Sequence, residues 1–290
     1  AGLPEIFESE GYDRTSMKLP KCQDRLIEEV LKVQPNVVVV LHNGSPVELP
    51  WADRVSAILE MYLGGQGVGE ACDRLLFGEA NPSGRLSETF PYRLEDNPSF
   101  LHFPGNGKRV LYGEDIFVGY RYYDTKKVPV RYAFGHGLSY TEFTYGDLTL
   151  SSAQMTDEDI LTVSLKVKNS GKTEGKEVVQ LYVADLCGIS ERPVKELKGF
   201  AKVHLLPGEE KTVSMEISAR NLSYYEERLG DWYAPSGTYR ILIGHASDDI
   251  RLHADVVFET KKKLPLRVDF TTTFGELLDH TKTAPVITEL

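Results

Sequence analysis

The amino-acid sequence predicts two regions of different fold class, α/β followed by all-β. In the first hundred residues, segments with helical periodicity alternate with short apolar runs. This order predicts part of a mainly parallel sheet covered by helices. From about Phe143 the apolar residues alternate with polar ones, and glycine or proline interrupts the pattern about every ten residues. That second pattern predicts an antiparallel β-sandwich.

The first predicted helix covers residues 23–33, and Pro35 ends it. Its apolar residues recur at helical spacing, with Glu and Lys on the other face: Leu26, Ile27, Val30 and Leu31. Residues 36–44 are a β-branched run ending in Asn-Gly, which is typical of a strand buried on both faces. Residues 55–65 predict a second such strand, and residues 67–78 predict a second amphipathic helix ended by glycine.

The all-β region is predicted over residues 140–260. Its strand-like segments begin with TVSLKVKN and KEVVQLYVAD and end with GTYRILIGHA and LHADVVFE. Turn-forming residues mark its corners: Gly171, Gly175, Pro207, Gly208, Pro235 and Gly237. Short strands at this spacing are typical of sandwiches of the immunoglobulin or fibronectin type, so a fibronectin-III-like β-sandwich is expected.

Two further segments join or follow these regions. Residues 106–139 form an interdomain connector rich in Tyr and Phe, which predicts packing between the domains rather than a free linker. Residues 261–290 form a C-terminal tail, in which Thr273 is a candidate N-cap for a short helix. Its apolar residues lie on one side of that helix: Phe274, Leu277 and Leu278. Such a helix requires a surface to pack on, either on this chain or on a partner.

Composition argues against several classes of partner. A formal net charge of −10 argues against nucleic acid, because phosphate binding depends on clustered Lys and Arg. No apolar run approaches the roughly 18 residues of a membrane span. The opening AGLPEIF is similar to the end of a buried strand and predicts further sequence upstream. Three widely spaced cysteines fit neither a disulfide framework nor a zinc site, and they favour a cytoplasmic over a secreted protein. Asn43 and Asn221 match the glycosylation pattern, so the compartment stays open.

Three other motifs are candidate sites that ordinary structural roles also explain. Residues 64–70, GGQGVGE, follow a predicted strand and open a predicted helix, where a phosphate could bind. Their spacing differs from the dinucleotide motif, however, and close packing explains the glycines equally well. No histidine pair has metal-ligand spacing, and His42 and His136 are interpreted as structural. Ser45 and Ser83 lie in turns rather than in a nucleophile elbow. Neither a metal nor a cofactor is expected.

The segment FESEGYDR, residues 7–14, brings three carboxylates and an arginine together around one glycine: Glu8, Glu10, Asp13 and Arg14. One explanation is a solvated loop in which Arg14 pairs locally. The other is a proton donor held over a pocket. Glycoside hydrolysis needs one carboxylic acid to protonate the leaving oxygen and a second carboxylate to attack or to activate water. Glu10, next to Gly11, is the candidate for that acid, whose pKa has to be raised.

Several motifs resemble those of family 3 glycoside hydrolases, the β-glucosidases in particular. In order they are ESEGYDR, KLP, VVVVLHNGSPVELPW, GGQGVGEACDRLLFGEANPSGRLSETFP, GYRYYD and YAFGHGLSYTEF. The resemblance runs from Glu8 to about Ala246. The tail motif TTTFGELL is similar to the segment that often follows the last domain of these enzymes.

The resemblance implies a domain arrangement and a set of roles. Family members have a (β/α)₈-type barrel, an α/β sandwich domain and a fibronectin-III-like domain, so residues 1–105 would be the later part of the α/β sandwich domain. In members whose motif reads E-G-Y-D-R, the general acid/base matches Glu10. Asp13 and Arg14 would brace its loop, and Glu8 would be peripheral. The nucleophile is an aspartate on the barrel, which these residues lack, so the substrate-binding residues stay unassigned.

The resulting expectation is the acid/base-bearing part of a retaining β-glucosidase that hydrolyses terminal non-reducing β-D-glucosyl residues, active only together with the missing barrel domain. The expected partners are a β-glucoside or short β-glucan oligosaccharide and the barrel-domain segment of the same enzyme, and a homo-oligomer is left open. One alternative is a non-catalytic carbohydrate-binding or assembly module. Another is a nucleotide-binding protein based on residues 64–70. These residues do not determine sugar or linkage specificity.

Overall fold

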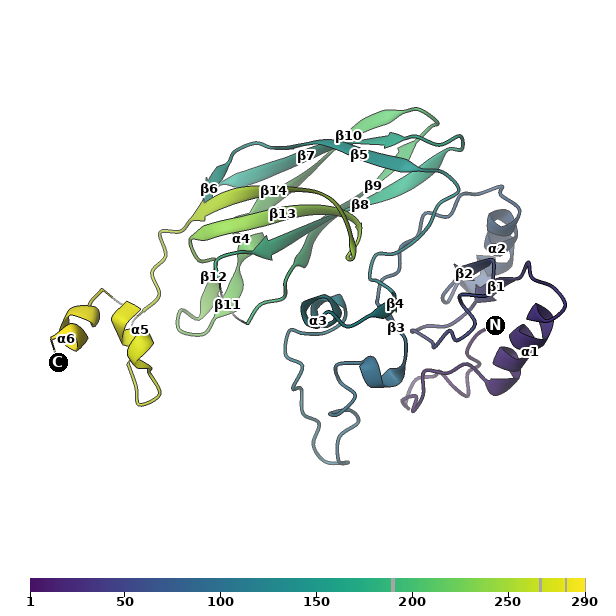
Figure 1. Ribbon diagram of the computed structural model, residues 1–290, viewed down its shortest axis with the longest axis horizontal. Coiled ribbons are helices and arrows are strands. Elements are labelled where there is room, and N and C mark those ends of the chain that lie inside the picture. The colour runs from purple at the N-terminus through teal and green to yellow at the C-terminus, as the bar shows by residue number, and fades with distance from the viewer. Residues whose placement is uncertain (189–190, 266–267, 280, 290) are drawn as a thin grey trace.

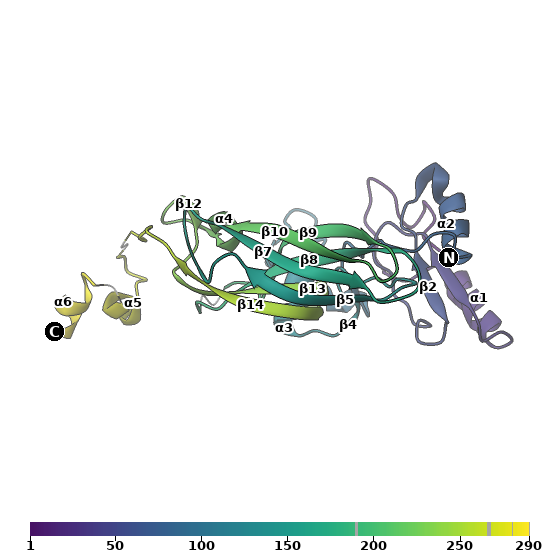
Figure 2. The same ribbon diagram turned by 90° about the horizontal axis from the view of Figure 1, so that it is seen from above.

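The computed structural model describes residues 1–188, 191–265, 268–279 and 281–289. Three parts follow one another along the long axis of the molecule (Figure 1). The α/β region holds the N-terminus at one end, the β-sandwich lies in the middle, and the C-terminal tail extends beyond the opposite end of the sandwich. The view from above shows the same order (Figure 2).

Two short parallel strands organise the α/β region. Strand β1 (Val38–Leu41) pairs with β2 (Ala57–Glu60) in the parallel orientation, as predicted. On the N-terminal segment, Gly2 forms a parallel bridge to His42, which follows β1. The helical elements are α1 (Lys21–Leu31), the 3-10 turn η1 (Gly65–Gly67) and α2 (Val68–Leu76). The predicted helices are therefore present within two residues of their expected bounds, whereas both strands are present but much shorter than predicted.

Burial in the α/β region differs from the prediction. Val39 and Leu41 of β1 are buried, whereas Val38 is 49% exposed. Helix α1 buries Ile27 alone, its Leu26 is 64% exposed, and α2 buries no residue. Alternating burial along β1 means that the core covers one face of the strand pair. The prediction of strands buried on both faces is therefore wrong for this part of the chain.

The core of the α/β region centres on Trp51, whose side chain is fully buried. Its indole Nε1 donates a hydrogen bond to Asp24 Oδ1 of α1 at 2.9 Å, so the core also fixes the helix. The other buried residues of this cluster are Leu19, Ile27, Val39, Leu41, Val47, Leu49, Ala52 and Phe90. The N-terminal segment, α1, β1 and the loop after β1 thus share one core.

A second strand pair lies between the α/β region and the sandwich. Strands β3 (Phe90–Pro91) and β4 (Val130–Tyr132) are antiparallel. Among the described residues, the predicted mainly parallel sheet is thus reduced to the β1–β2 pair and the bridge beside it. The short turn η2 (Leu94–Asp96) follows β3.

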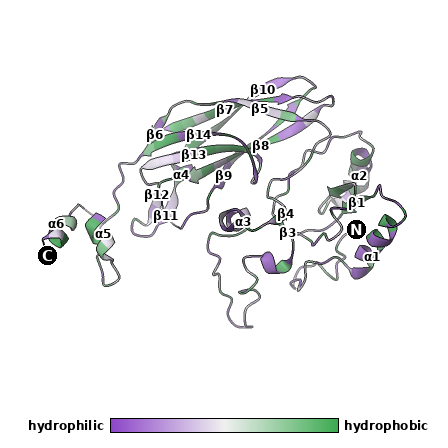
Figure 3. Cartoon of the chain, viewed as in Figure 1, coloured by the Kyte–Doolittle hydropathy of each residue, from purple (hydrophilic) through white to green (hydrophobic). Residues whose placement is uncertain are grey.

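The β-sandwich consists of a three-stranded and a five-stranded sheet, with strand orders β10-β7-β5 and β6-β14-β13-β8-β9. Its elements are β5 (Phe143–Leu150), β6 (Gln154–Thr156), β7 (Ile160–Asn169), β8 (Gly175–Asp185), β9 (Glu196–Leu205), β10 (Glu210–Ser218), α4 (Ala219–Leu222), the paired β11 (Tyr224–Glu226) and β12 (Asp231–Tyr233), β13 (Gly237–Ala246) and β14 (Asp249–Glu259). The predicted alternation is confirmed in β7, where Leu161, Val163, Leu165 and Val167 are buried. Hydrophobic stretches occur in strands of both sheets, among them β7, β8 and β14 (Figure 3).

The aromatic connector packs against the sandwich through Tyr120, the first residue of helix α3 (Tyr120–Lys126). The Tyr120 ring stacks on Phe134 at a centroid distance of 4.8 Å and meets the edge of Tyr182 on β8 at 5.9 Å. Its hydroxyl accepts a hydrogen bond from the Leu197 backbone N–H at 2.7 Å. These contacts agree with the predicted packing for the part of the connector that begins at Tyr120, whereas residues 106–113 are exposed.

The C-terminal tail forms two short helices, α5 (Phe274–Asp279) and α6 (Ala284–Thr288). The predicted N-cap is present, because Thr273 Oγ1 accepts a hydrogen bond from the Glu276 backbone N–H at 3.2 Å and the Glu276 carboxylate accepts one from the Thr273 backbone N–H at 2.7 Å. Phe274 remains 74% exposed and Leu278 48% exposed. The surface expected to cover these side chains is not provided by the sandwich, from which the tail extends away (Figure 2).

Candidate active site

The loop that carries Glu10 folds back on itself near the N-terminus. The backbone N–H groups of Phe7 and Glu8 donate to the Pro4 carbonyl at 2.7 and 3.2 Å. The Tyr12 hydroxyl donates to the Glu5 carbonyl at 2.5 Å and closes the loop further out. Gly11 has a φ of +91°, a left-handed conformation that glycine adopts without strain. Glu10 therefore lies at an exposed turn of a loop closed by its own hydrogen bonds.

The ends of this loop are fixed to the turn that follows β1. Glu8 Oε2 accepts a hydrogen bond from the Gly44 backbone N–H at 2.6 Å, and Glu8 Oε1 accepts one from Ser45 Oγ at 2.5 Å. Arg14 Nη2 donates to Ser45 Oγ at 2.6 Å and to the Pro46 carbonyl at 3.0 Å. Glu8 and Arg14 are half-buried, whereas residues 9–13 between them are exposed.

These contacts change the roles expected within the cluster. Arg14 braces the loop, as predicted. Glu8 is a bracing residue as well, so the prediction that it is peripheral is wrong. Asp13 is exposed and makes no hydrogen bond or ion pair within the described residues. The residue of this loop that braces it together with Arg14 is therefore Glu8, because both side chains bond to Ser45 Oγ. Likewise, no hydrogen bond or ion pair of the Glu10 side chain occurs in the part of the chain that the structure describes.

Two further carboxylates that the sequence did not single out lie near this anchor. Glu60, at the end of β2, accepts hydrogen bonds from the Tyr62 backbone N–H at 2.8 Å and from Asn43 Nδ2 at 3.2 Å. Burial raises the pKa of Glu60 to about 7, although these two hydrogen bonds oppose the rise. Burial also raises the pKa of Glu88, and the positive charge of Arg14 opposes it. The sequence held one signal that could have predicted the contact between Asn43 and Glu60. Asn43 follows β1 and Glu60 ends β2, and the carboxyl ends of adjacent parallel strands meet at one edge of the sheet.

Glu60→Gln is expected to flatten the pH dependence of stability. A carboxyl whose pKa is raised on folding contributes stability that is complete below its unfolded pKa and is lost as the pH rises through about 7. The wild type should therefore lose stability relative to the variant between about pH 5 and pH 8. Urea unfolding across this range measures the difference, and Glu70→Gln, an exposed carboxylate on α2, is the matched control. Parallel pH profiles for wild type and Glu60→Gln would contradict this expectation.

The other candidate residues are accounted for by local structure. A Cβ on Gly64 would lie 2.5 Å from Val68 Cγ2, so close packing at the start of α2 requires this glycine. His42 lies at the bridge to Gly2, and His136 stacks on Tyr132 with a centroid distance of 5.1 Å. Burial lowers the pKa of His136. These observations favour the structural interpretation of residues 64–70 and of both histidines.

The remaining candidate positions that the structure describes show no sign of a metal site or of a modification site. Within the described ranges, no three or more His, Cys, Asp and Glu side chains gather closely enough to hold a metal ion. The helices of the same ranges include no candidate membrane span. Asn43 is fully buried and its amide donates to the Ser45 carbonyl, so the folded chain does not present it for glycosylation. Ser83 is half-buried, and Cys22, Cys72 and Cys187 are free thiols.

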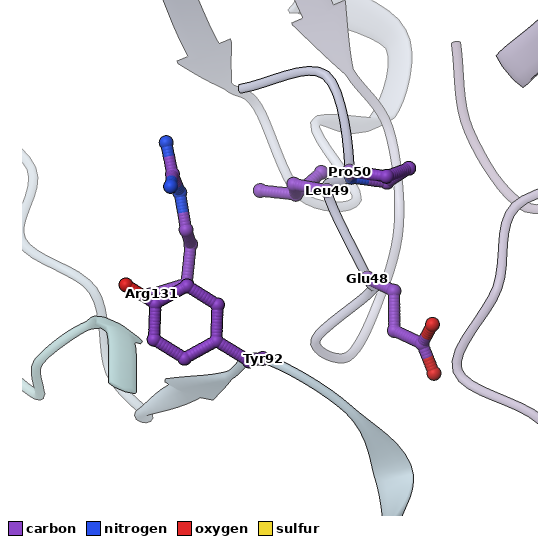
Figure 4. A pocket seen from close by; sticks show the side chains of 5 residues that line it. All are labelled: Glu48, Leu49, Pro50, Tyr92 and Arg131. Atoms are coloured by element: carbon purple, nitrogen blue, oxygen red, sulfur yellow. The ribbon is translucent and has the colours of Figure 1, made fainter. Parts of the chain in front are cut away.

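A small hollow lies between the loop after β1 and the β3–β4 pair (Figure 4). Arg131 and Tyr92 lie on one side of it, and Leu49 and Pro50 on the other; Glu48 completes the lining. Its volume is about 80 Å³, which is below the roughly 300–1,000 Å³ of typical ligand sites. This hollow is too small for a sugar ring and does not include Glu10.

Comparison with known proteins identifies both regions. Residues 1–140 match the glycosyl hydrolase family 3 C-terminal domain, and residues 177–247 match a fibronectin type III-like domain. The chain is a homologue of the family 3 β-glucosidases. It is 52% identical over 287 residues to thermostable β-glucosidase B of Acetivibrio thermocellus, and the match covers 99% of this chain and 38% of that protein.

Solved structures of family 3 β-glucosidases have the same fold. The enzyme from Bifidobacterium adolescentis superimposes with a TM-score of 0.90 at 39% identity, covering 99% of this chain and 42% of the other. The enzyme from Kluyveromyces marxianus, determined in complex with glucose, superimposes with a TM-score of 0.84 at 44% identity, covering 89% of this chain and 31% of the other. The chain thus spans less than half the length of these family 3 proteins.

Proposed function

We propose that this chain is the acid/base-bearing part of a retaining β-glucosidase and that Glu10 is its general acid/base. The observation that carries the proposal is the placement of Glu10 at an exposed turn between two anchored residues, Glu8 and Arg14. A carboxyl in this position can enter a sugar pocket supplied by another segment. The motif around it, within a family 3 domain, supports the same role.

The expected reaction has two steps. Glu10 protonates the glycosidic oxygen while an aspartate on the barrel segment, outside this chain, attacks the anomeric carbon. Glu10 then removes a proton from water, which releases the sugar with retained configuration. The two carboxyl groups have to lie about 5–5.5 Å apart for this outcome. The substrate is expected to be a terminal non-reducing β-D-glucosyl residue, and glucose complexes of related β-glucosidases from Kluyveromyces marxianus and Thermotoga neapolitana support that choice.

A second candidate function is a non-catalytic assembly module. The small volume of the hollow beside Arg131 is compatible with it, because a module that only supports the barrel segment needs no sugar pocket of its own. The two proposals differ in what the chain contributes to the enzyme. In the first, Glu10 takes part in proton transfer; in the second, the enzyme formed with a barrel segment is insensitive to Glu10.

Glu10→Gln tests the choice in the enzyme that contains both the barrel segment and this chain. We expect kcat/KM to fall by about 100-fold or more for β-glucosides whose leaving group needs protonation, because general acid catalysis contributes on this scale. For activated aryl glucosides kcat/KM should change little, since their leaving groups depart without the acid. Glu5→Gln removes an exposed carboxylate from the same loop and is the control. Equal loss on both substrate classes would rule out the acid/base role of Glu10.

A further inference from the structure

Both ends of the Glu10 loop meet at one hydroxyl group. Ser45 Oγ donates to Glu8 Oε1 at 2.5 Å and accepts from Arg14 Nη2 at 2.6 Å. A serine hydroxyl has one proton and two lone pairs, so it can make both bonds at once. The residues before and after the five exposed positions 9–13 are therefore joined through a single atom.

The anchor itself is held by the core of the α/β region. Leu41 and Val47, on either side of the turn, are each 1% exposed, and Asn43 is fully buried. Asn43 Nδ2 donates to the Ser45 carbonyl at 3.0 Å, and Arg14 reaches the Pro46 carbonyl at the same distance. The Ser45 hydroxyl is thus fixed by a packed turn rather than by the loop that it binds.

We propose that Ser45 is a positioning residue for proton transfer, because it ties Glu8 and Arg14 together and so fixes the place of Glu10. This inference rests on the proposed function of Glu10. A catalytic group has to be held within about 0.5 Å of its productive position, and a displacement of about 1 Å can cost roughly 100-fold in rate. The Glu10 side chain itself makes no hydrogen bond or ion pair in the described residues, so its position depends on the anchored ends of its loop and on the bond from Tyr12 to the Glu5 carbonyl.

Removal of the Ser45 hydroxyl should loosen the loop without unfolding it. In Ser45→Ala, Glu8 keeps its bond from the Gly44 backbone N–H, and Arg14 keeps its bond to the Pro46 carbonyl. In the enzyme with the barrel segment, we expect kcat/KM to fall roughly 10- to 100-fold for poor leaving groups and to change little for activated ones. Ser45→Thr, which retains the hydroxyl, should restore most of the loss. Ser9→Ala, in the same loop, is the matched control.

The double variant separates positioning from a general structural effect. In the Glu10→Gln background, Ser45→Ala should cause no further loss on poor leaving groups, because the group that it positions is already absent. Additive losses would overturn the inference. So would a loss in Ser45→Ala that is equal for both substrate classes.

Hydrogen exchange on the chain itself gives a test that does not depend on catalysis. Ser45→Ala should speed amide exchange in residues 7–14 and leave β1 unchanged. Unaltered exchange in residues 7–14 would overturn the positioning role even if Glu10 is the acid/base. A third outcome is faster exchange in Ser45→Ala together with a Glu10→Gln effect that does not depend on the leaving group. In that case Ser45 does hold the loop, but the proposed function of Glu10 fails, and the role of Ser45 in proton transfer fails with it.

Discussion

Glu177→Ala is expected to lower the free energy of unfolding by about 3–5 kcal/mol, the cost of breaking a buried ion pair from one side. The Glu177 side chain is fully buried, and its two oxygens lie 3.1 and 3.0 Å from Arg85 Nη2. Tyr145 donates to Glu177 Oε1 at 3.1 Å, and His245 Nδ1 lies 3.0 Å from the same atom. Without this carboxylate, the Arg85 guanidinium, 6% exposed, stays buried without its counter-charge.

The position of this network explains why a large effect is expected. Arg85 belongs to the segment before β3, whereas Glu177 lies on β8, so the ion pair joins the first region to the sandwich. Burial by itself would raise the pKa of Glu177, but the hydrogen bond from His245 and the charges of Arg85 and His245 outweigh it and lower the pKa. A lowered pKa contributes stability that is present above the unfolded pKa and is lost as the pH falls through the folded value. The cost of Glu177→Ala should therefore shrink in acid.

Urea unfolding followed by circular dichroism and tryptophan fluorescence measures this effect. Trp51 reports on the α/β region and Trp232 on the sandwich, so the loss can be assigned to either part. Asp255→Ala breaks the exposed pair of Arg240 and Asp255 and should cost less than about 1 kcal/mol. Replacing both partners, as Arg85→Met with Glu177→Leu, should recover most of the stability. A cost for Glu177→Ala no larger than that for Asp255→Ala would contradict the expectation.

Local periodicity predicted most of the elements. The alternation along β7 was sufficient because each residue of a strand faces either the core or the solvent. Thr273 and Glu276 were within one turn of each other, so a cap could be predicted from their spacing. The prediction that β1 is buried on both faces was wrong, because a run of valines is compatible with one covered face as well as with two.

Roles that depend on polar contacts between residues far apart in the sequence could not be predicted from local patterns. Glu8 and Glu10 are indistinguishable by composition, and the partners of Glu8 lie 36 and 37 residues away. In the sequence, Glu177 has the pattern of an ordinary solvent-facing residue of a strand. Its partner Arg85 is 92 residues away along the chain, so local spacing could not predict the ion pair. Glu10 was singled out by one motif and by the resemblance of that motif to those of family 3 enzymes, and its role is the prediction that Glu10→Gln tests.

Trp51→Ala is expected to lower the free energy of unfolding of the α/β region by about 3–5 kcal/mol. The indole is fully buried and fills the centre of the cluster that also contains Leu41 and Val47. Truncation removes this apolar surface and leaves a cavity that the surrounding strands and helix can fill only partly. It also removes the hydrogen bond to Asp24, whose carboxyl has a pKa raised chiefly by burial.

Trp51→Phe separates packing from hydrogen bonding. Phenylalanine keeps most of the apolar volume and loses the indole N–H, so its cost should be close to the roughly 1 kcal/mol of one hydrogen bond plus a small cavity. Because Leu41 and Val47 lie on either side of the turn that holds Ser45, Trp51→Ala should also speed hydrogen exchange in residues 7–14, whereas Trp51→Phe should not. Urea unfolding and exchange on the same preparations test both statements. A stability loss in Trp51→Ala with unchanged exchange in residues 7–14 would show that the Glu10 loop is held independently of this core.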